Sequence, residues 1–531
     1  MNTPAWLASA VFYQVYPQSF ADSNGDGIGD LPGLIAKLPY IKSLGVTALW
    51  LNPIFESPFG DAGYDVADFR KVAPRYGTNS DAIRLFEEAH KLGLKVVLDL
   101  VAGHTSEQHP WFHDSAQRIP GVFRDRYIWT DTPWSALGDK GFVIGNCDRA
   151  AAYHANFFYF QPSLNYGFAQ PDPTKPWQQP VSAPGPQATR GELRAIMEFW
   201  LQAGCDGFRV DMADSLIKGD PDRSGIRDFW SDFRSWLDVD WPEAVLVSEW
   251  GNPAESIGAG FHIDFMLHFG EPAYRHLMSP CVEPAPRDNR FAAPCFLQAQ
   301  GGIGPRAFVE NYIRHLQATA GAGYIALPTG NHDFSRPSYG RTAEDLRVVF
   351  ATLLTLPGVP FIYYGDEIGL RYRDDLPSKE GGYGRTGTRT PMQWQAGVPN
   401  LGFSNAPADQ LYLPVDATPD APTVGAQEHD AASLLHFVRH LLALRREHPA
   451  LSNDGDFVAL HAPVEPAPFV YQRTLGGRSI LVVVNPTATP GQCPLPRFTT
   501  AGAHALLNHG VTLDATRIRC APRSYAIYAV E

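Results

Sequence analysis

The sequence predicts an α/β protein whose main body is a (β/α)8 TIM barrel. Short apolar runs rich in β-branched and aromatic residues alternate with amphipathic helical patterns through most of the 531 residues. A long stretch without this rhythm follows the third run, and the end of the chain has the pattern of strands alone. We therefore expect a barrel, an inserted domain after its third strand and a C-terminal antiparallel β-domain.

Seven apolar runs are expected to be barrel strands, because each is short and most are followed by a helical pattern. They are 11–16, 48–51, 96–100, 207–210, 245–248, 324–327 and 359–364. Amphipathic helices are expected at 80–92 and 191–203, with Gly204 as the C-cap of the second.

The stretch from His104 to Pro186 is rich in aromatic residues, proline and glycine, which predicts a long insertion. A helix over 433–448 stops before Pro449, and strands follow at 469–474, 480–484 and 524–530. The expected domains are the barrel over 1–103 and 187–448, the insertion over 104–186, and a C-terminal β-sandwich over 449–531.

Composition limits the partners. Asp and Glu number 56 against 43 Lys and Arg, for a net charge of −13, and there is no long basic run, which argues against nucleic acid or an anionic membrane as a partner. The six cysteines form no CxxC pair, and no apolar run approaches the roughly 18 residues that span a bilayer. We expect a cytoplasmic monomer or homodimer without an organic cofactor.

Two acidic residues stand directly after predicted strands, where a barrel gathers its catalytic groups. Asp211 ends the run that contains Arg209, whose guanidinium favours the ionised carboxylate that a nucleophile needs. Glu249 lies beside Trp250, and an apolar neighbour raises the pKa of a carboxyl group, as suits a general acid.

A third acidic residue, Asp333, follows the run 324–327 next to His332. It could stabilise a positively charged transition state on a polyhydroxylated substrate such as a sugar. Any one of these carboxylates taken alone could instead cap the helix that follows. Their occurrence on separate strands, together with the segment 99–104, favours a shared site.

Four segments in chain order carry a family resemblance: DLVAGH at 99–104, GFRVD at 207–211, SEWG at 248–251 and GNHD at 330–333. In these the chain resembles the α-amylase superfamily, glycoside hydrolase family 13, whose retaining enzymes have the fold expected above. The resemblance implies that Asp211 is the nucleophile, Glu249 the acid/base and Asp333 the transition-state stabiliser. It further implies that His104, Arg209 and His332 line the subsite of the transferred sugar.

Four more segments are similar to the oligo-1,6-glucosidase and α-glucosidase branch: AVFYQVYPQSF at 10–20, GDAGYDVADF at 60–69, YYGDEIG at 363–369 and RTPMQW at 389–394. This similarity implies that Asp61 and Arg389 form a pair that closes the sugar pocket, and that Tyr64 stacks on the sugar ring. A closed pocket implies exo action. Met212 differs from the residues that accompany α-1,6 or α-1,4 preference in this branch, so the linkage stays open.

The loop from Asp22 to Asp30 has oxygen-bearing residues at alternate positions, as in the first part of an EF-hand loop. We expect a structural Ca²⁺ or Mg²⁺ held by the side chains of Asp22, Asn24, Asp26 and Asp30 and the carbonyl of Ile28. Gly33 stands where the bidentate Glu of such a loop is expected, and Asx turns alone could also explain this composition.

The leading functional hypothesis is a retaining α-glucosidase that releases terminal glucose from short oligosaccharides or disaccharides. A glucosyltransferase or isomerase, similar to trehalose synthases or sucrose-acting enzymes, would begin with the same covalent intermediate. A non-catalytic binding subunit is the third possibility, and the three intact carboxylates argue against it.

Overall fold

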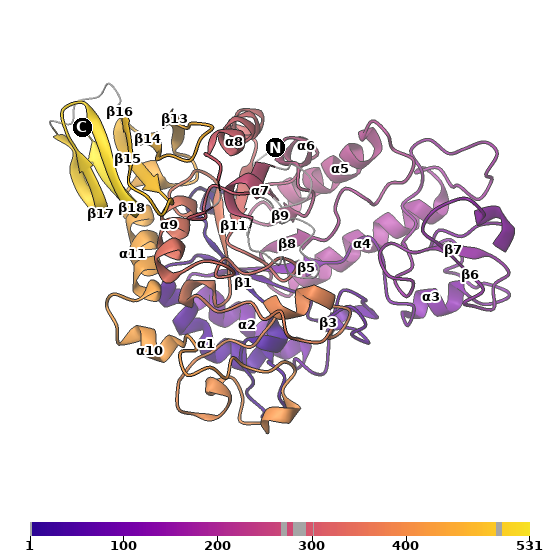
Figure 1. Ribbon diagram of the computed structural model, residues 1–531. Coiled ribbons are helices and arrows are strands. Elements are labelled where there is room, and N and C mark those ends of the chain that lie inside the picture. Colours follow the sequence, from indigo (N-terminus) through magenta and orange to yellow (C-terminus); the bar gives the residue numbers. More distant parts are fainter. Residues whose placement is uncertain (1–2, 267–272, 280–293, 301, 495–501, 531) are drawn as a thin grey trace.

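The structure is a computed structural model that describes residues 3–266, 273–279, 294–300, 302–494 and 502–530, so Cys281 lies outside the described residues. Its centre is a closed barrel of eight parallel strands (Figure 1). Around the barrel the strands are β1 (Phe12–Val15), β12 (Val359–Tyr363), β11 (Tyr324–Pro328), β10 (Ile263–Phe265), β9 (Val245–Ser248), β8 (Gly207–Val210), β5 (Lys95–Leu100) and β2 (Ala48–Leu51). The predicted barrel is confirmed.

All seven predicted barrel strands are present with small shifts at their ends. The eighth strand, β10, was missed. It is three residues long and has Asp264 at its centre, so it forms no apolar run. The pairing of β10 with β9 and β11 is what completes the closed sheet.

Side chains fill the inside of the barrel. Phe12 on β1 and Phe361 on β12 stack with ring centroids 4.4 Å apart, and Phe265 and Trp50 pack beside them. Because the interior is closed in this way, a substrate site can form only at an end of the barrel.

The longer helices pack around the barrel. They are α1 (Leu31–Leu44), α2 (Asn79–Lys91), α4 (Pro184–Gln202), α5 (Ser224–Asp240), α8 (Arg306–Thr319), α9 (Ala343–Leu353) and α11 (Leu434–Glu447), with the short helices α6 (Pro253–Gly258), α7 (Ala273–Met278) and α10 (Val424–Glu428). Helix α4 begins seven residues before the predicted start. The prediction missed its first turns because they contain prolines, which are tolerated at the start of a helix, where an N–H has no partner within the helix. The expected boundary between insertion and barrel therefore falls inside α4.

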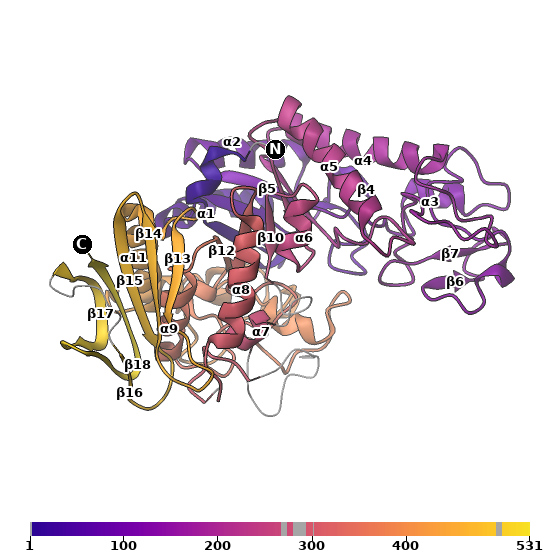
Figure 2. The ribbon, with the colours of Figure 1, turned by 90° about the horizontal axis from the view of Figure 1, so that it is seen from above.

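The inserted segment extends away from the barrel, at the end of the molecule opposite the C-terminal sheet (Figures 1 and 2). It contains the short helix α3 (Pro110–Ser115) and the two-stranded sheet of β6 (Phe142–Ile144) and β7 (Ala152–His154). A second small sheet, β3 (Phe55–Glu56) with β4 (Asp68–Val72), lies in the loop after β2.

The C-terminal strands are β13 (Asp456–His461), β14 (Phe469–Leu475), β15 (Arg478–Asn485), β16 (Gly491–Pro494), β17 (His504–Leu513) and β18 (Arg517–Val530). The hydrogen bonds join them into one antiparallel sheet, in place of the expected β-sandwich. The first half of β18 escaped prediction because Arg517, Arg519 and Arg523 interrupt its apolar pattern.

The described cysteines are free thiols. Among the helices of the described chain, none combines the length and apolar character needed to cross a bilayer. The compartment and the oligomeric state stay predictions.

Candidate active site

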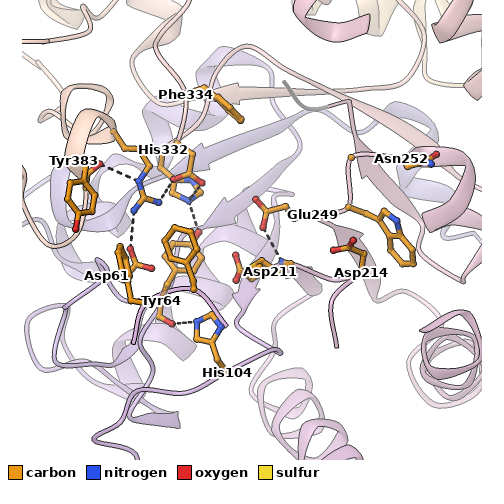
Figure 3. Close-up of a pocket in the computed structure, with 18 of the residues that line it drawn as sticks. Asp61, Tyr64, His104, Asp211, Asp214, Glu249, Asn252, His332, Phe334 and Tyr383 are labelled. Carbon is orange, nitrogen blue, oxygen red and sulfur yellow. Dashed lines mark hydrogen bonds and ion pairs between the residues drawn. The ribbon is translucent and has the colours of Figure 1, made fainter. Parts of the chain in front are cut away.

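A cavity of about 890 Å³ opens where the barrel strands end, and most of the predicted sugar-site residues line it (Figure 3). Asp211 follows β8, Glu249 follows β9 and Asp333 follows β11. The wall is completed by residues of the insertion and of the loops after β2, β8, β9, β11 and β12: Asp61, Tyr64, His104, Phe157, Phe158, Met212, Asp214, Arg223, Trp250, Asn252, Glu255, His332, Phe334, Tyr383 and Arg385.

The guanidinium of Arg209 joins three carboxylates. Its Nη1 lies 2.9 Å from Asp99 Oδ1 and 2.9 Å from Asp211 Oδ1, and its Nη2 lies 2.9 Å from Glu249 Oε1. The family resemblance implied that Arg209 lies on the wall of the sugar subsite. In the structure Arg209 is buried against these carboxylates and is not among the residues that line the cavity, so a contact between Arg209 and a sugar stays a prediction.

Burial raises the pKa of Glu249 to about 8 and that of Asp211 to about 6. Arg209 opposes both shifts, but it does not outweigh burial and the neighbouring carboxylates. The effect of Arg209 on Asp211 has the expected direction, because the guanidinium lowers the pKa of that carboxyl group, but burial has the larger effect. Near pH 7 Glu249 still favours its protonated form and Asp211 its ionised form.

Met212 contributes a backbone contact to this pair. Its N–H donates to Glu249 Oε2 at 3.0 Å, and its φ of 44° lies in the left-handed region that non-glycine residues rarely adopt. The turn directly after Asp211 thus holds the carboxyl group of Glu249 close to Asp211.

Asp333 has a different environment. Its Oδ1 lies 2.9 Å from Arg385 Nη1 and 3.2 Å from Arg389 Nη2, and its Oδ2 lies 3.2 Å from His332 Nε2. Burial opposes ionisation, but the contact with His332 and the charges of Arg385, Arg389 and Arg209 outweigh it and hold the pKa of Asp333 well below its usual range. Asp333 is therefore a permanent negative charge in the cavity.

His332 and Tyr64 form a buried network in the wall of the cavity. The rings stack with centroids 5.3 Å apart, and the hydroxyl of Tyr64 lies 2.8 Å from His332 Nε2 and donates to Asp99 Oδ2 at 2.9 Å. Burial lowers the pKa of His332 to about 3, so the ring is neutral at pH 7. Both residues line the cavity, as the sequence analysis expected, and a role of Tyr64 in stacking on a sugar stays a prediction.

The ion pair of Asp61 differs from the expected one. Asp61 accepts hydrogen bonds from Arg385 Nη2 at 3.2 Å and from Gln161 Nε2 at 2.9 Å. Arg389, the predicted partner, is 1% exposed and contacts Asp333 and the carbonyl of His332 instead. Both arginines belong to or border the short 3-10 segment Tyr383–Thr388, and only the fold decides which of them reaches the cavity.

His104 is placed as expected, on the cavity wall. Its Nε2 lies 3.0 Å from the carbonyl of Tyr64, and Asn156 of the insertion donates to its Nδ1 at 3.0 Å. A Cβ at Gly103 would lie 2.8 Å from the Asn156 amide nitrogen, so a larger residue there would require the Asn156 side chain to shift. Burial lowers the pKa of His104 to about 4 and keeps the ring neutral.

The loop from Asp22 to Asp30 folds through Asx turns. Each Oδ1 atom of Asp22, Asn24 and Asp26 accepts a hydrogen bond from the backbone N–H two residues later. Asp30 caps helix α1 by accepting a hydrogen bond from the N–H of Gly33 at 2.6 Å. In the described chain, no three His, Cys, Asp or Glu side chains gather in a way that could hold a metal ion. These turns account for the loop composition without an ion, and the metal, including the carbonyl ligand from Ile28, stays a prediction.

Several residues of the site were not predicted as functional. Asp99 is the first residue of the segment DLVAGH, and its position one residue before the end of β5 could have indicated a residue of the site. Arg385, Asp214 and Arg223 come from loops whose course no local pattern fixes, so sequence reasoning had no signal for them.

Comparison with known proteins agrees with the geometry. The family model described as alpha amylase, catalytic domain, matches residues 14–454. The trehalose synthase/amylase TreS of Mycobacterium tuberculosis is 32% identical over 516 residues, covering 89% of this chain and 80% of that protein. The oligo-1,6-glucosidase of Parageobacillus thermoglucosidasius is 30% identical over 532 residues, covering 90% of each.

Solved structures are similar over the whole chain. The alpha-glucosyl transfer enzyme XgtA matches with a TM-score of 0.80 and 29% identity, covering 100% of both chains. The trehalulose synthase MutB from Pseudomonas mesoacidophila matches with a TM-score of 0.79 and 26% identity, covering 99% of both. The names of these relatives include a glucosidase and an amylase as well as two synthases and a glucosyl transfer enzyme.

Proposed function

Because this chain belongs to the α-amylase family of glycoside hydrolases, we propose that it is a retaining α-glucosidase that releases terminal α-linked glucose from short oligosaccharides or disaccharides. The observation that carries the proposal is that Asp211 and Glu249 both form ion pairs with Arg209 and yet favour different protonation states near pH 7. Two close carboxyl groups, one ionised and one protonated, are what double displacement requires.

In the first step, Asp211 attacks the anomeric carbon while Glu249 gives its proton to the glycosidic oxygen, so that the bond to the leaving group breaks as the glucosyl ester forms. In the second step, Glu249 removes a proton from water, which attacks the same carbon and releases Asp211. Asp333 faces the positive charge that develops on the sugar ring in both steps.

The contacts of Asp61 support exo action. Arg385 links Asp61 to Asp333 across the end of the cavity, at 3.2 Å and 2.9 Å. A carboxylate and a guanidinium together can accept from and donate to one terminal sugar hydroxyl, and we expect them to block a chain that extends past it.

Transfer to a second sugar is the other candidate, because TreS, XgtA and MutB carry synthase or transfer names. Product analysis on maltose, isomaltose, trehalose, sucrose and nigerose separates the candidates. Free glucose in proportion to the bond cleaved supports hydrolysis, and new disaccharides support transfer or isomerisation.

The anomer of the first product tests the retaining mechanism. We expect proton NMR to show α-glucose first when an α-glucoside is cleaved, since two inversions restore the configuration. Initial β-glucose would contradict the mechanism. No cleavage of an aryl α-glucoside, or of any sugar in the panel, would favour the non-catalytic alternative.

A further inference from the structure

A second cavity, of about 440 Å³, lies in the inserted segment, which extends away from the barrel (Figure 2). All the residues that line it belong to the range 118–179, and none of them lines the cavity at the end of the barrel. Its volume falls within the range of about 300 to 1,000 Å³ that is typical of small-molecule sites. The function proposed above gives this second cavity no role.

Three arginines line the second cavity, although the protein as a whole has a net charge of −13: Arg118, Arg124 and Arg149. The carboxylates in its wall are those of Asp125 and Asp131, and Arg124 Nε lies 3.5 Å from Asp125 Oδ1. Within the part of the chain that the structure describes, neither Arg118 nor Arg149 forms an ion pair. Two guanidinium groups of this wall are therefore available to an anion.

The guanidinium of Arg149 has a fixed position. Its Nη1 donates to the carbonyls of Ser115 and Arg124, both at 3.0 Å, and its central carbon lies 4.5 Å from the ring centroid of Trp129. The indole is held in turn, because its N–H donates to Ser115 Oγ at 2.8 Å. The Nε and Nη2 atoms of Arg149 make no hydrogen bond to any described residue. These two atoms form the edge of a guanidinium that can bind two oxygens of one oxyanion.

The surroundings of Arg149 disfavour its positive charge. Burial, followed by the charge of Arg124, lowers the pKa of Arg149 to about 10, so the group is still protonated at pH 7. Asp125 opposes this shift without cancelling it. A bound anion would compensate the charge of Arg149, because an opposite charge close by stabilises the ionised form.

We propose that the second cavity is a binding site for a phosphate group, either free phosphate or the phosphate of a sugar phosphate. Phosphate carries nearly two negative charges at pH 7, which matches Arg118 and Arg149, and its oxygens can accept hydrogen bonds from the free edge of Arg149. The rest of the wall can receive a hydroxylated ring, because it contains the indole of Trp177, the amide of Gln179 and the carboxylate of Asp131. The proposal does not depend on the reaction at the barrel.

Calorimetry with inorganic phosphate and with glucose 6-phosphate tests the site in the whole chain. Arg118→Ala should weaken the binding of both compounds about tenfold, and Arg149→Ala should weaken it at least as much. Arg118 is exposed, so its loss should leave folding intact, and this variant decides alone if Arg149→Ala does not fold. The matched control is Arg194→Ala, because Arg194 also lies over an indole, that of Trp236, outside both cavities. The control should leave both affinities unchanged.

The same titrations distinguish the source of the phosphate. Tighter binding of glucose 6-phosphate than of inorganic phosphate would identify a sugar phosphate as the ligand, and equal affinities would identify free phosphate. Glucose at saturating concentration should displace neither compound. The site would be overturned by the absence of binding at millimolar concentrations, by full affinity in Arg118→Ala and in folded Arg149→Ala, or by displacement of inorganic phosphate by glucose.

Discussion

At the residue scale, Asp211 and Glu249 titrate as a pair because both form ion pairs with Arg209. Burial raises their pKa values to about 6 and about 8. We therefore expect kcat/KM to rise with pH as the nucleophile ionises near pH 6 and to fall as the acid loses its proton near pH 8. A pH profile with an aryl glucoside measures both limbs. An alkaline limb that persists in Glu249→Gln would contradict the assignment of the acid.

Removing either carboxyl group should abolish turnover without unfolding the protein. We expect Asp211→Ala and Glu249→Gln to lower kcat by about a thousandfold or more, because each group acts in the chemical step. Azide should partly restore the first variant. Activity within about tenfold of wild type in either variant would be inconsistent with these roles.

The same shifts predict the direction of a stability effect. Because the folded pKa of Glu249 is raised, the folded state binds its proton more tightly than the unfolded chain, and stability is lost as pH rises toward about 8. Glu249→Gln removes this penalty. Its Tm should equal or exceed that of wild type near pH 8, and a clear decrease there would show that the ionised carboxylate stabilises the fold.

Substitutions of Arg385 and Arg389 should differ in their effect on the Tm of the protein. Arg385 has 22% of its side chain exposed and bridges Asp61 and Asp333, so Arg385→Ala should reduce glucose release about tenfold to a hundredfold with little change in Tm. Arg389 is buried against Asp333 and the His332 carbonyl, so Arg389→Ala should also lower Tm.

Maltoheptaose labelled at its reducing end reports on the closed pocket. Wild type should produce glucose and a ladder that shortens one unit at a time. Early fragments of middle length would show an open cleft and an endo-acting enzyme. Arg385→Ala should slow the ladder, and a faster appearance of middle-length fragments in that variant would show that Arg385 closes the end of the pocket.

At the element scale, the loop from Asp22 to Asp30 tests the predicted metal. If Ca²⁺ or Mg²⁺ binds there, EDTA should lower Tm and added metal should restore it, while kcat changes little, because ligand binding to the folded state alone stabilises it. Asp26→Ala should remove this response. Asp30→Ala also removes the N-cap of α1, worth about 1 kcal/mol, and is the less specific variant. A Tm that is independent of EDTA and metal would leave Asx turns as the explanation of the loop.

At the scale of the whole molecule, Arg473 on β14 connects the C-terminal sheet to the barrel domain through hydrogen bonds. It is fully buried and donates to the carbonyls of Thr355, Ser452, Gly455 and Asp456. Arg473→Met leaves these acceptors unpaired, so the free energy of unfolding should fall by about 3 kcal/mol or more. Calorimetry should show one transition in wild type. The control is Arg478→Met, an exposed position on β15, and an equal effect of both variants would contradict this role.

The sequence by itself determined the barrel, seven of its strands and the carboxylates at their ends. Alternation of apolar runs with helical patterns is local information, and so is an acidic residue directly after a strand. Once the strands are parallel, their carboxyl ends must meet at one face. Asp211, Glu249 and Asp333 were therefore predictable as neighbours before any contact was known.

The tertiary structure alone decided which side chains complete the site. Arg385 and Arg389 lie four residues apart with similar surroundings in sequence, and packing of the loop after β12 places one in the cavity and buries the other. The short strand β10 and the strained residue Arg223 likewise depend on neighbours far along the chain. The physical reason is that a loop has no repeating pattern of its own, so the course of its backbone is set by the surfaces against which it packs.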